Sequence, residues 1–355
     1  MELGILGLPK AGKTTLFNLL TASAAATDKF AQSRSAHVAV ARVPDGRLAA
    51  LRDLFRPRKF TPATVRFVDI PGLERGQGSA NLDLVRLREV DGLVHVVRAF
   101  DDPDLPRPAG GLDPERSVAE VDLELVLADL ELVERRLDRL RQSAKRGAKP
   151  EEERERELLE ATIAPALAAE RPLRGIELAA EEAKRLRGFQ LLSAKPLLRV
   201  WNVDEGALAA TLASARPPPG PGERRVILSA PIEEQIARLP AGEAAEFLAA
   251  YGLSEPSLDR VIRAGYDLLG LFSFFTVGED EVRAWTIRRG TPAREAAGAV
   301  HSDIERGFIR AEIVAWDELL RRGSLAACRE AGTLRIEGKD YLVQDGEVAH
   351  FRFNV

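Results

Sequence analysis

The sequence is poor in the residues that disulfide-linked, metal-binding and membrane-spanning proteins depend on. It has one cysteine, Cys328, in 355 residues, which excludes an intrachain disulfide framework and a cysteine-based metal site. It has no run of about eighteen apolar residues, so it predicts no transmembrane helix. Its first residues enter an apolar strand pattern without the basic segment of a cleavable signal. We therefore expect a cytoplasmic protein that binds no membrane.

A surplus of positive charge is also missing. The net charge of −4 at pH 7 creates no general attraction for nucleic acid, so any contact with RNA must use a local patch. The hydrophobic content of 45% is ordinary for a protein that buries real cores. A length of 355 residues suggests two or three domains.

A phosphate-binding pattern opens the chain. Residues 7–14 read G-L-P-K-A-G-K-T and match G-x-x-x-x-G-K-[ST] between an apolar strand pattern and a helical pattern. Loop and helix N–H groups in this arrangement cradle the β-phosphate. Lys13 would reach the β- and γ-phosphates, and the Thr14 hydroxyl would hold Mg²⁺. The residues expected to bind the nucleotide here are Gly7, Pro9, Lys10, Ala11, Gly12, Lys13, Thr14 and Thr15.

A second phosphate-binding element follows the strand pattern at 64–69, which ends in D-I-P-G. Asp69 would bind Mg²⁺ through water, and the Gly72 N–H would sense the γ-phosphate. A further magnesium-binding hydroxyl is expected in the aperiodic stretch 23–36. Ser33 and Ser35 are candidates there, and they are equally compatible with a solvent-facing linker.

The residue after Gly72 is Leu73, where many GTPases carry the glutamine that orients the attacking water. Leucine cannot orient water, so the backbone, another side chain or a partner must do so. Gln77, in the glycine-rich stretch that follows, is one candidate substitute. His95 lies within an apolar strand pattern at 92–98, which favours a satisfied core histidine over a catalytic one.

The base-recognition motif departs from the guanine-specific sequence N-K-x-D. A strand pattern at 195–201 delivers Asn202, Val203, Asp204 and Glu205 at its carboxyl end, where α/β folds bind ligands. Valine replaces the lysine and glutamate replaces the aspartate that reads guanine. The motif therefore weakens strict guanine selection and favours adenine as an alternative. Residues 229–231 match the loop that closes over the base, with Ser229, Ala230 and Pro231 as candidate contacts.

A long helical pattern at 118–146 separates the two halves of this nucleotide domain. Its apolar positions step by four and three, as in a coiled-coil seam, at Val126, Leu130, Val133, Leu137 and Leu140. Arginine and lysine crowd its distal half, and a return helix rich in glutamate and arginine begins at Glu151. This basic tip is equally compatible with RNA phosphates and with a solvated coiled-coil face.

The last part of the chain behaves as a separate module. Residues 272–277 and 282–287 alternate like a hairpin, a short helix pattern covers 292–301, and strands are predicted at 308–314, 341–343 and 348–353. Two strands, a helix and further strands predict a small β-grasp fold.

The whole chain resembles the YchF family of Obg-related P-loop GTPases. The matching runs are residues 7–9 with 12–14, 43–45, 62–65, 68–70, 88–91, 127–131, 202–205, 274–278, 282–287, 305–312, 337–341 and 350–355. The resemblance implies a nucleotide domain at 1–117 and 190–272, a helical coiled-coil insertion at 118–189 and a TGS domain at 273–355. It also implies hydrolysis of ATP at least as readily as GTP, and association with ribosomes through the insertion and the TGS domain.

The chain departs from this family at several positions. Lys10 stands where the family usually has an asparagine that, in related GTPases, ligates K⁺ near the α- and γ-phosphates. Its ammonium either replaces that ion or points into solvent. Pro71 stands where alanine is usual, Ser33 stands where threonine is expected, and the loop 74–81 is shorter than usual.

The predicted fold is an α/β P-loop NTPase domain, Ras-like with a mainly parallel sheet, with a helical insertion and a C-terminal β-grasp module. The predicted function is that of a monomeric, Mg²⁺-dependent, ribosome-associated ATPase, in which Lys13, the Gly72 amide and Lys10 stabilise charge on the reacting phosphate. A strict GTPase, and a non-hydrolysing nucleotide-switched scaffold that Leu73 would favour, remain alternatives.

Overall fold

The computed structural model describes residues 1–25, 38–70, 83–105, 111–145, 147, 149–214 and 217–354. The chain forms two compact units. The first comprises Met1–Val40 and Arg66–Ala264, and the second comprises Ala41–Val65 and Gly265–Val355. Within the described ranges no helix has both the length and the apolar character needed to cross a membrane.

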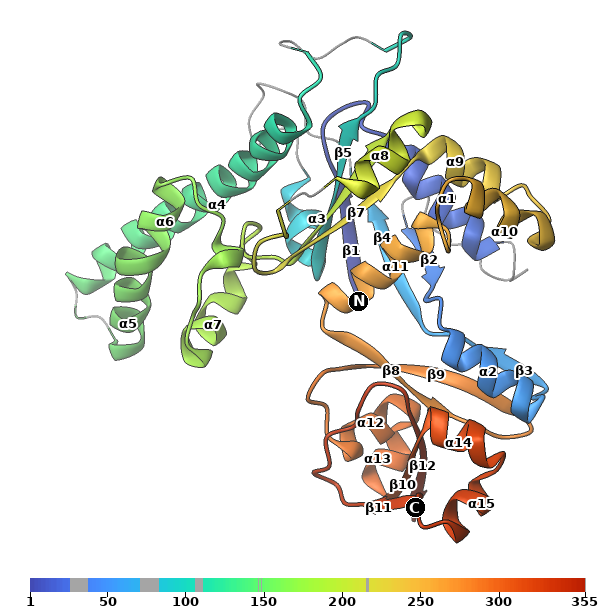
Figure 1. Cartoon of the computed structure of the whole chain (residues 1–355). Helices are drawn as coiled ribbons and strands as arrows, with labels where there is room; N and C mark the ends of the chain where they lie inside the picture. Colours follow the sequence, from blue (N-terminus) through green and yellow to red (C-terminus); the bar gives the residue numbers. More distant parts are fainter. Residues whose placement is uncertain are drawn as a thin grey trace. The chain divides into compact units, whose positions relative to one another are not determined.

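The first unit is built on a sheet with the strand order β2-β4-β1-β5-β6-β7 (Figure 1). Its strands are β1 (Glu2–Leu6), β2 (Val38–Arg42), β4 (Thr64–Asp69), β5 (Gly92–Ala99), β6 (Leu197–Val203) and β7 (Glu223–Leu228). β1 pairs in parallel with β4 and β5, and β6 pairs in parallel with β5 and β7. Because parallel strands end at one edge of a sheet, the motifs that follow β1, β4, β5 and β6 are brought to the same edge.

Helices lie on both sides of this sheet, with α3 and α4 on one side and α1, α9 and α10 on the other (Figure 1). The helices that complete the nucleotide-binding part are α1 (Lys13–Ala25), α3 (Leu84–Glu89), α8 (Leu208–Ala213), α9 (Ala230–Ile236), α10 (Ala241–Ala250) and α11 (Ser257–Leu268). α3 and the first turns of α4 bury Leu87, Val121 and Leu125 against strand residues such as Leu93 and Leu197. The nearly continuous burial of β5 and β6 follows from this double cover.

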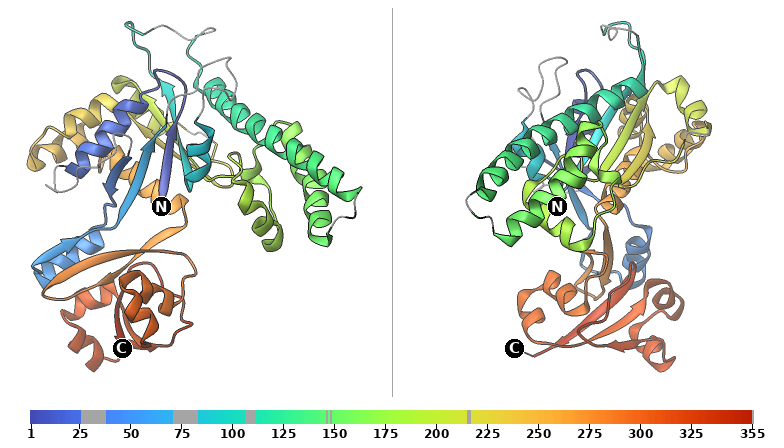
Figure 2. Two further views of the ribbon diagram at one scale, coloured as in Figure 1. Left: turned by 180° about the vertical axis from the view of Figure 1, so that it is seen from behind. Right: turned by 90° about the vertical axis from the view of Figure 1, so that its left-hand side faces the viewer.

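The helical insertion leaves this sheet through α4 (Pro114–Ala144), which starts at the N-cap Asp113 (Figure 2). The chain returns through α5 (Pro150–Leu158), a π-helical turn (Leu159–Ile163), α6 (Ala164–Ala168) and α7 (Ala180–Leu186). The predicted seam is confirmed: Val126, Val133, Leu137 and Leu140 are buried against the returning helices, and Leu130 packs at their border.

The basic side chains of the insertion are partly neutralised within the helix pair. Arg136 makes a two-pronged contact with Glu155, with nitrogen–oxygen distances of 2.7 and 3.0 Å. Arg141 Nε donates to Glu160 at 3.0 Å. These contacts favour a paired coiled-coil face over bare positive charge at Arg136 and Arg141. Each exposed pair contributes little to stability.

Asp129, on α4, fastens the insertion to the segment that leads into β6. Its side chain is fully buried and accepts hydrogen bonds from the Leu192 N–H at 2.9 Å and the Ser193 N–H at 2.7 Å. It also accepts from the Ser193 hydroxyl at 2.8 Å and from Arg88 at 3.0 Å. A carboxylate with this many donors is a stable buried charge, and it fixes where β6 begins.

The second unit contains a mixed sheet with the strand order β11-β10-β12-β8-β9-β3. Its strands are β3 (Lys59–Thr61), β8 (Leu271–Thr276), β9 (Glu281–Arg288), β10 (Phe308–Ala315), β11 (Arg335–Glu337) and β12 (Glu347–Phe353). Its helices are α2 (Gly46–Phe55), α12 (Ala293–Val300), α13 (Ser302–Arg306), α14 (Trp316–Arg322) and α15 (Leu325–Glu330). The antiparallel β8–β9 hairpin, with β12 parallel to β8 and α12 packed on the sheet, is the expected β-grasp arrangement.

Two features of this unit differ from the sequence-based expectations. Residues 41–65, expected within the nucleotide domain, join the second unit because β3 pairs with β9 and the Arg47 guanidinium contacts Asp345 at 2.9 Å. The strand predicted at 341–343 is wrong: Leu342 forms only an isolated bridge with Pro292. The chain there is irregular because no partner strand continues the ladder.

His95 is a core residue, as expected, but its polar atoms are not satisfied. The side chain is fully buried on β5, and neither ring nitrogen has a hydrogen-bond partner among the described residues. Burial, followed by the positive charge of the nearby Arg199 guanidinium, lowers the pKa of His95 to about 3. The ring is therefore neutral in the folded protein at physiological pH.

Replacing Asp129 tests the anchor of the insertion. Asp129→Ala would leave the Leu192 and Ser193 amides without their side-chain acceptor. It would also remove the carboxylate from the Arg88 guanidinium, which keeps its bonds to the Gln190 and Ala128 carbonyl oxygens. We expect it to lower the free energy of unfolding by about 3–5 kcal/mol, measured by urea denaturation. The control Glu131→Ala removes an exposed carboxylate from the same helix and should change it by less than about 0.5 kcal/mol. Equal effects of the two variants would contradict this role.

The buried imidazole predicts a loss of stability in mild acid. Because its pKa is about 3 when folded and about 6.5 when unfolded, His95 favours the unfolded state as the pH falls from 6.5 toward 3. Between pH 7 and pH 5 this contribution amounts to about 2 kcal/mol. His95→Leu should abolish it, whereas His301→Leu, at an exposed site, should keep the wild-type pH dependence. Parallel stability curves for wild type and His95→Leu would refute the prediction.

Candidate functional site

The phosphate loop lies between β1 and α1 and holds two glycines that no other residue can replace. Gly7 has φ +149°, and a Cβ there would stand 2.5 Å from the carbonyl oxygen of Val96. Gly12 has φ +97°, and its Cβ would stand 2.4 Å from the amide nitrogen of the Asn202 side chain. The glycines of the motif thus let the loop approach β5 and the base-recognition strand closely.

Lys13 begins α1 and is held by the loop itself. Its ammonium donates to the carbonyl oxygens of Gly7 and Leu8, each at 2.9 Å. Burial lowers the pKa of Lys13, and the negative charge of Asp69 opposes that shift. Asp69 ends β4 opposite Ile5 of β1, so the first residue of the second predicted phosphate-binding element lies beside the strand that leads into the loop.

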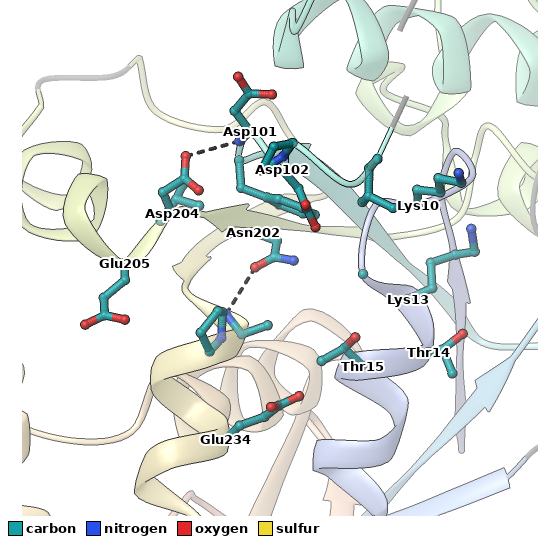
Figure 3. Close-up of a pocket in the computed structure, with 17 residues that line it drawn as sticks. Lys10, Lys13, Thr14, Thr15, Asp101, Asp102, Asn202, Asp204, Glu205 and Glu234 are labelled. Atoms are coloured by element: carbon teal, nitrogen blue, oxygen red, sulfur yellow. Dashed lines mark hydrogen bonds between the residues drawn. The ribbon is translucent and has the colours of Figure 1, made fainter. Parts of the chain in front are cut away.

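Lys10 adopts the left-handed backbone conformation, with φ +63°, which is uncommon for a residue with a side chain. Its side chain is exposed and lines the same pocket as Lys13. Figure 3 shows the two ammonium groups on the same side of the loop. The loop therefore presents two cations where the predicted phosphate chain would lie.

The predicted base-recognition residues lie at the carboxyl end of β6. The Asn202 side chain is buried and bridges two segments: its nitrogen donates to the Ala11 carbonyl at 3.3 Å, and its oxygen accepts from the Ala230 N–H at 3.1 Å. Asp204 accepts from the Asp101 N–H at 3.2 Å. Glu205 starts the next turn and accepts a hydrogen bond from the Tyr251 hydroxyl.

These segments enclose one pocket of about 620 Å³ within the first unit (Figure 3). Its size fits a nucleotide. The predicted residues that line it are Lys10, Gly12, Lys13, Thr14, Thr15, Asn202, Val203, Glu205, Ala230 and Pro231. The residues predicted to bind the phosphates and the residues predicted to bind the base therefore line one cavity.

Other predicted residues support the pocket or lie elsewhere. Gly7 and Ala11 contribute carbonyl oxygens that hold Lys13 and Asn202, and Pro9 is exposed on the loop. The Ser229 hydroxyl is buried without a hydrogen-bond partner among the described residues, at the N-cap of α9. The predictions for Ser33, Ser35, Pro71, Gly72, Leu73 and Gln77 fall outside the described residues.

The sequence reading missed one wall of the pocket. The residues that form it are Phe100, Asp101, Asp102, Pro103 and Leu105 after β5, with Glu234 on α9. The ring of Phe100 also packs against the Arg98 guanidinium, whose central carbon lies 5.1 Å from the ring centre. The signal was available, because β5 is parallel to β6 and its carboxyl end must reach the same sheet edge.

A magnesium ion fits the oxygen donors on the phosphate side. Thr14 offers an exposed hydroxyl in the first turn of α1, and Asp69 offers a carboxylate at the end of β4. Mg²⁺ in nucleotide sites takes one or two protein oxygens and fills its other positions with phosphate and water. In the described ranges no three acidic, histidine or cysteine side chains gather into a metal cluster. The donor set thus matches a metal held jointly with a nucleotide.

Comparisons with known proteins match this architecture along the whole chain. The family model YchF-GTPase_C, described as "Protein of unknown function (DUF933)", matches residues 271–354, and a model described as "50S ribosome-binding GTPase" matches residues 2–141. A protein named "Ribosome-binding ATPase YchF" from Bacillus subtilis is 42% identical, with 99% of each chain covered. "Obg-like ATPase 1" from Oryza sativa is 36% identical over all of this chain and 92% of its own length.

A solved structure supports the same relationship. The YchF GTPase of Schizosaccharomyces pombe superposes with a TM-score of 0.89 at 30% sequence identity. The superposition covers 99% of this chain and 97% of that one. The likeness therefore includes the helical insertion and the C-terminal module as well as the nucleotide pocket.

Proposed function

This chain belongs to the YchF family, and on that premise we propose that it is a ribosome-binding, Mg²⁺-dependent nucleoside triphosphatase that prefers ATP. The observation that carries the proposal is the single pocket in which the phosphate loop, Asn202 and Glu205 meet. Relatives with 36–42% identity carry the names "Ribosome-binding ATPase YchF" and "Obg-like ATPase 1".

In the proposed reaction, water attacks the γ-phosphorus in line, and the bond to the β-phosphate oxygen breaks to give the nucleoside diphosphate and phosphate. Lys13 turns from the Gly7 and Leu8 carbonyls toward the phosphate oxygens and offsets charge that develops on them. Thr14 and Asp69 would hold Mg²⁺, which when bound would further neutralise the charge of the phosphates. The Gly72 amide, which lies outside the described residues, is the predicted contact of the γ-phosphate.

The proposed protein has three domains, two of which contact the ribosome. The proposed nucleotide domain spans 1–117 and 190–272, apart from residues 41–65, which belong to the compact unit of the C-terminal module. The proposed helical insertion spans 118–189, and the proposed TGS domain spans 273–355. The insertion and the TGS domain contact the ribosome, and the protein is a cytoplasmic monomer. Cosedimentation with ribosomes in ATP and in ADP tests the nucleotide-controlled contact, which equal binding in both nucleotides would contradict.

Base preference is tested at Glu205. Aspartate in this position reads the N1–H and N2–H₂ donors of guanine in N-K-x-D sites. Glu205→Asp should therefore shift the ratio of ATP to GTP affinity toward GTP by about tenfold or more, measured by competition against a fluorescent nucleotide.

Lys13→Ala should lower the rate of hydrolysis of either nucleotide by about a hundredfold, because the ammonium that offsets charge on the phosphates is lost. Wild-type protein that binds GTP alone, or that binds nucleotide on the ribosome without turnover, would contradict the ATPase proposal.

We further propose that Lys10 acts as a built-in cation in place of a potassium ion. Hydrolysis by the wild type should then differ by less than about twofold between K⁺ and Na⁺ buffers. Lys10→Asn removes the ammonium yet suits the left-handed backbone at φ +63°, so the fold should persist. That variant should become dependent on K⁺. Strong K⁺ stimulation of the wild type would refute the idea.

A further inference from the structure

Glu205, the proposed base-reading carboxylate, is not a free side chain. Its Oε1 accepts a hydrogen bond from the hydroxyl of Tyr251, forty-six residues further along the chain. Figure 3 shows Glu205 on the far side of the pocket from Lys13, where a base would lie. One of its two oxygens is thus already engaged before any nucleotide enters.

Tyr251 is well placed to hold that bond, because its ring packs on its neighbours. It caps the C-terminus of α10, and its ring lies 5.1 Å from that of Phe247. Both rings pack against a buried cluster that includes Val203, the residue two before Glu205. The hydrogen bond to Glu205 raises the pKa of the Tyr251 phenol, which therefore stays a donor at neutral pH.

The engaged oxygen changes what the carboxylate can read. Guanine offers two adjacent donors, N1–H and N2–H₂, and a carboxylate binds both best when its two oxygens are available. Adenine offers one donor on this edge, the N6 amine, and needs one oxygen. The phenol takes one lone pair of Oε1 and fixes the direction of the carboxylate, so that Oε2 is the oxygen turned to a base. A carboxylate held in this way matches the single N6 donor of adenine and disfavours the paired donors of guanine.

We propose that Tyr251 is a positioning residue for base selection, which holds Glu205 with one oxygen occupied and so favours ATP over GTP. The inference rests on the proposed nucleotide pocket and adds to it a residue outside the lining of that pocket. Tyr251 would act through Glu205 and would not touch the base, the phosphates or the metal.

The test compares ATP and GTP affinities in Tyr251→Phe. Phenylalanine keeps the ring and its packing on Phe247 but removes the hydroxyl. The ratio of ATP to GTP affinity should fall by about threefold to tenfold, the net effect of one hydrogen bond at an exposed site. The KM values for the two nucleotides should move with the affinities, and kcat should stay unchanged.

Two further variants separate positioning from general structure. Tyr341→Phe removes a hydroxyl that donates to another glutamate, Glu347, at 2.6 Å in the second unit, and should leave the ratio unchanged. In a Glu205→Ala background, Tyr251→Phe should have no further effect on the ratio, because the carboxylate through which it acts is gone.

The outcomes are distinct. A lower ratio in Tyr251→Phe that disappears in the Glu205→Ala background supports the inference. An unchanged ratio, an equal loss of affinity for both nucleotides, or a shift that persists without Glu205 would overturn it and leave the proposed function intact. Wild-type protein that binds neither ATP nor GTP would overturn both.

Discussion

The amide side chain of Asn202 joins the parts of the nucleotide pocket. It donates to Ala11 in the phosphate loop and accepts from Ala230 at the start of α9, and its own strand ends at Val203, two residues before Glu205. Phosphate side and base side are therefore held at a fixed separation by one buried group. Gly12 is part of the same constraint, because the loop can approach Asn202 only without a side chain there.

The position of Asn202 depends in turn on how β6 is anchored. Asp129 of α4 binds the two amides that precede this strand, and Arg199 within it pairs with Asp122 of α4 at 2.7 Å and with Glu223 of β7 at 2.9 Å. The helical insertion is thus connected to the base-recognition strand through buried charges, whose removal leaves an unpaired partner. The insertion is therefore joined by hydrogen bonds and ion pairs to the strand that carries Asn202 into the pocket.

The features that could be predicted from the sequence are those that depend on residues close together in the chain. The phosphate loop, Asp69 at the end of its strand and the seam of α4 each follow from residues close together in the chain. The contact of Glu205 with Tyr251 and the pairing of β3 with β9 do not, because they join residues 46 and more than 200 positions apart. His95 shows the same limit: its apolar neighbours predicted burial, but only the fold reveals that its nitrogens lack partners in the described part of the chain.

The membership of residues 41–65 in the second unit has a consequence for synthesis of the chain. These residues leave the ribosome early, between two strands of the first sheet, yet β3 must wait for β9 at Glu281–Arg288 to acquire its pairing. Its edge stays unpaired while most of the protein is made, and an unpaired edge invites wrong partners. The C-terminal segment therefore completes a fold that was begun near the N-terminus, and a chain shortened after the nucleotide pocket would leave that early segment without its partner.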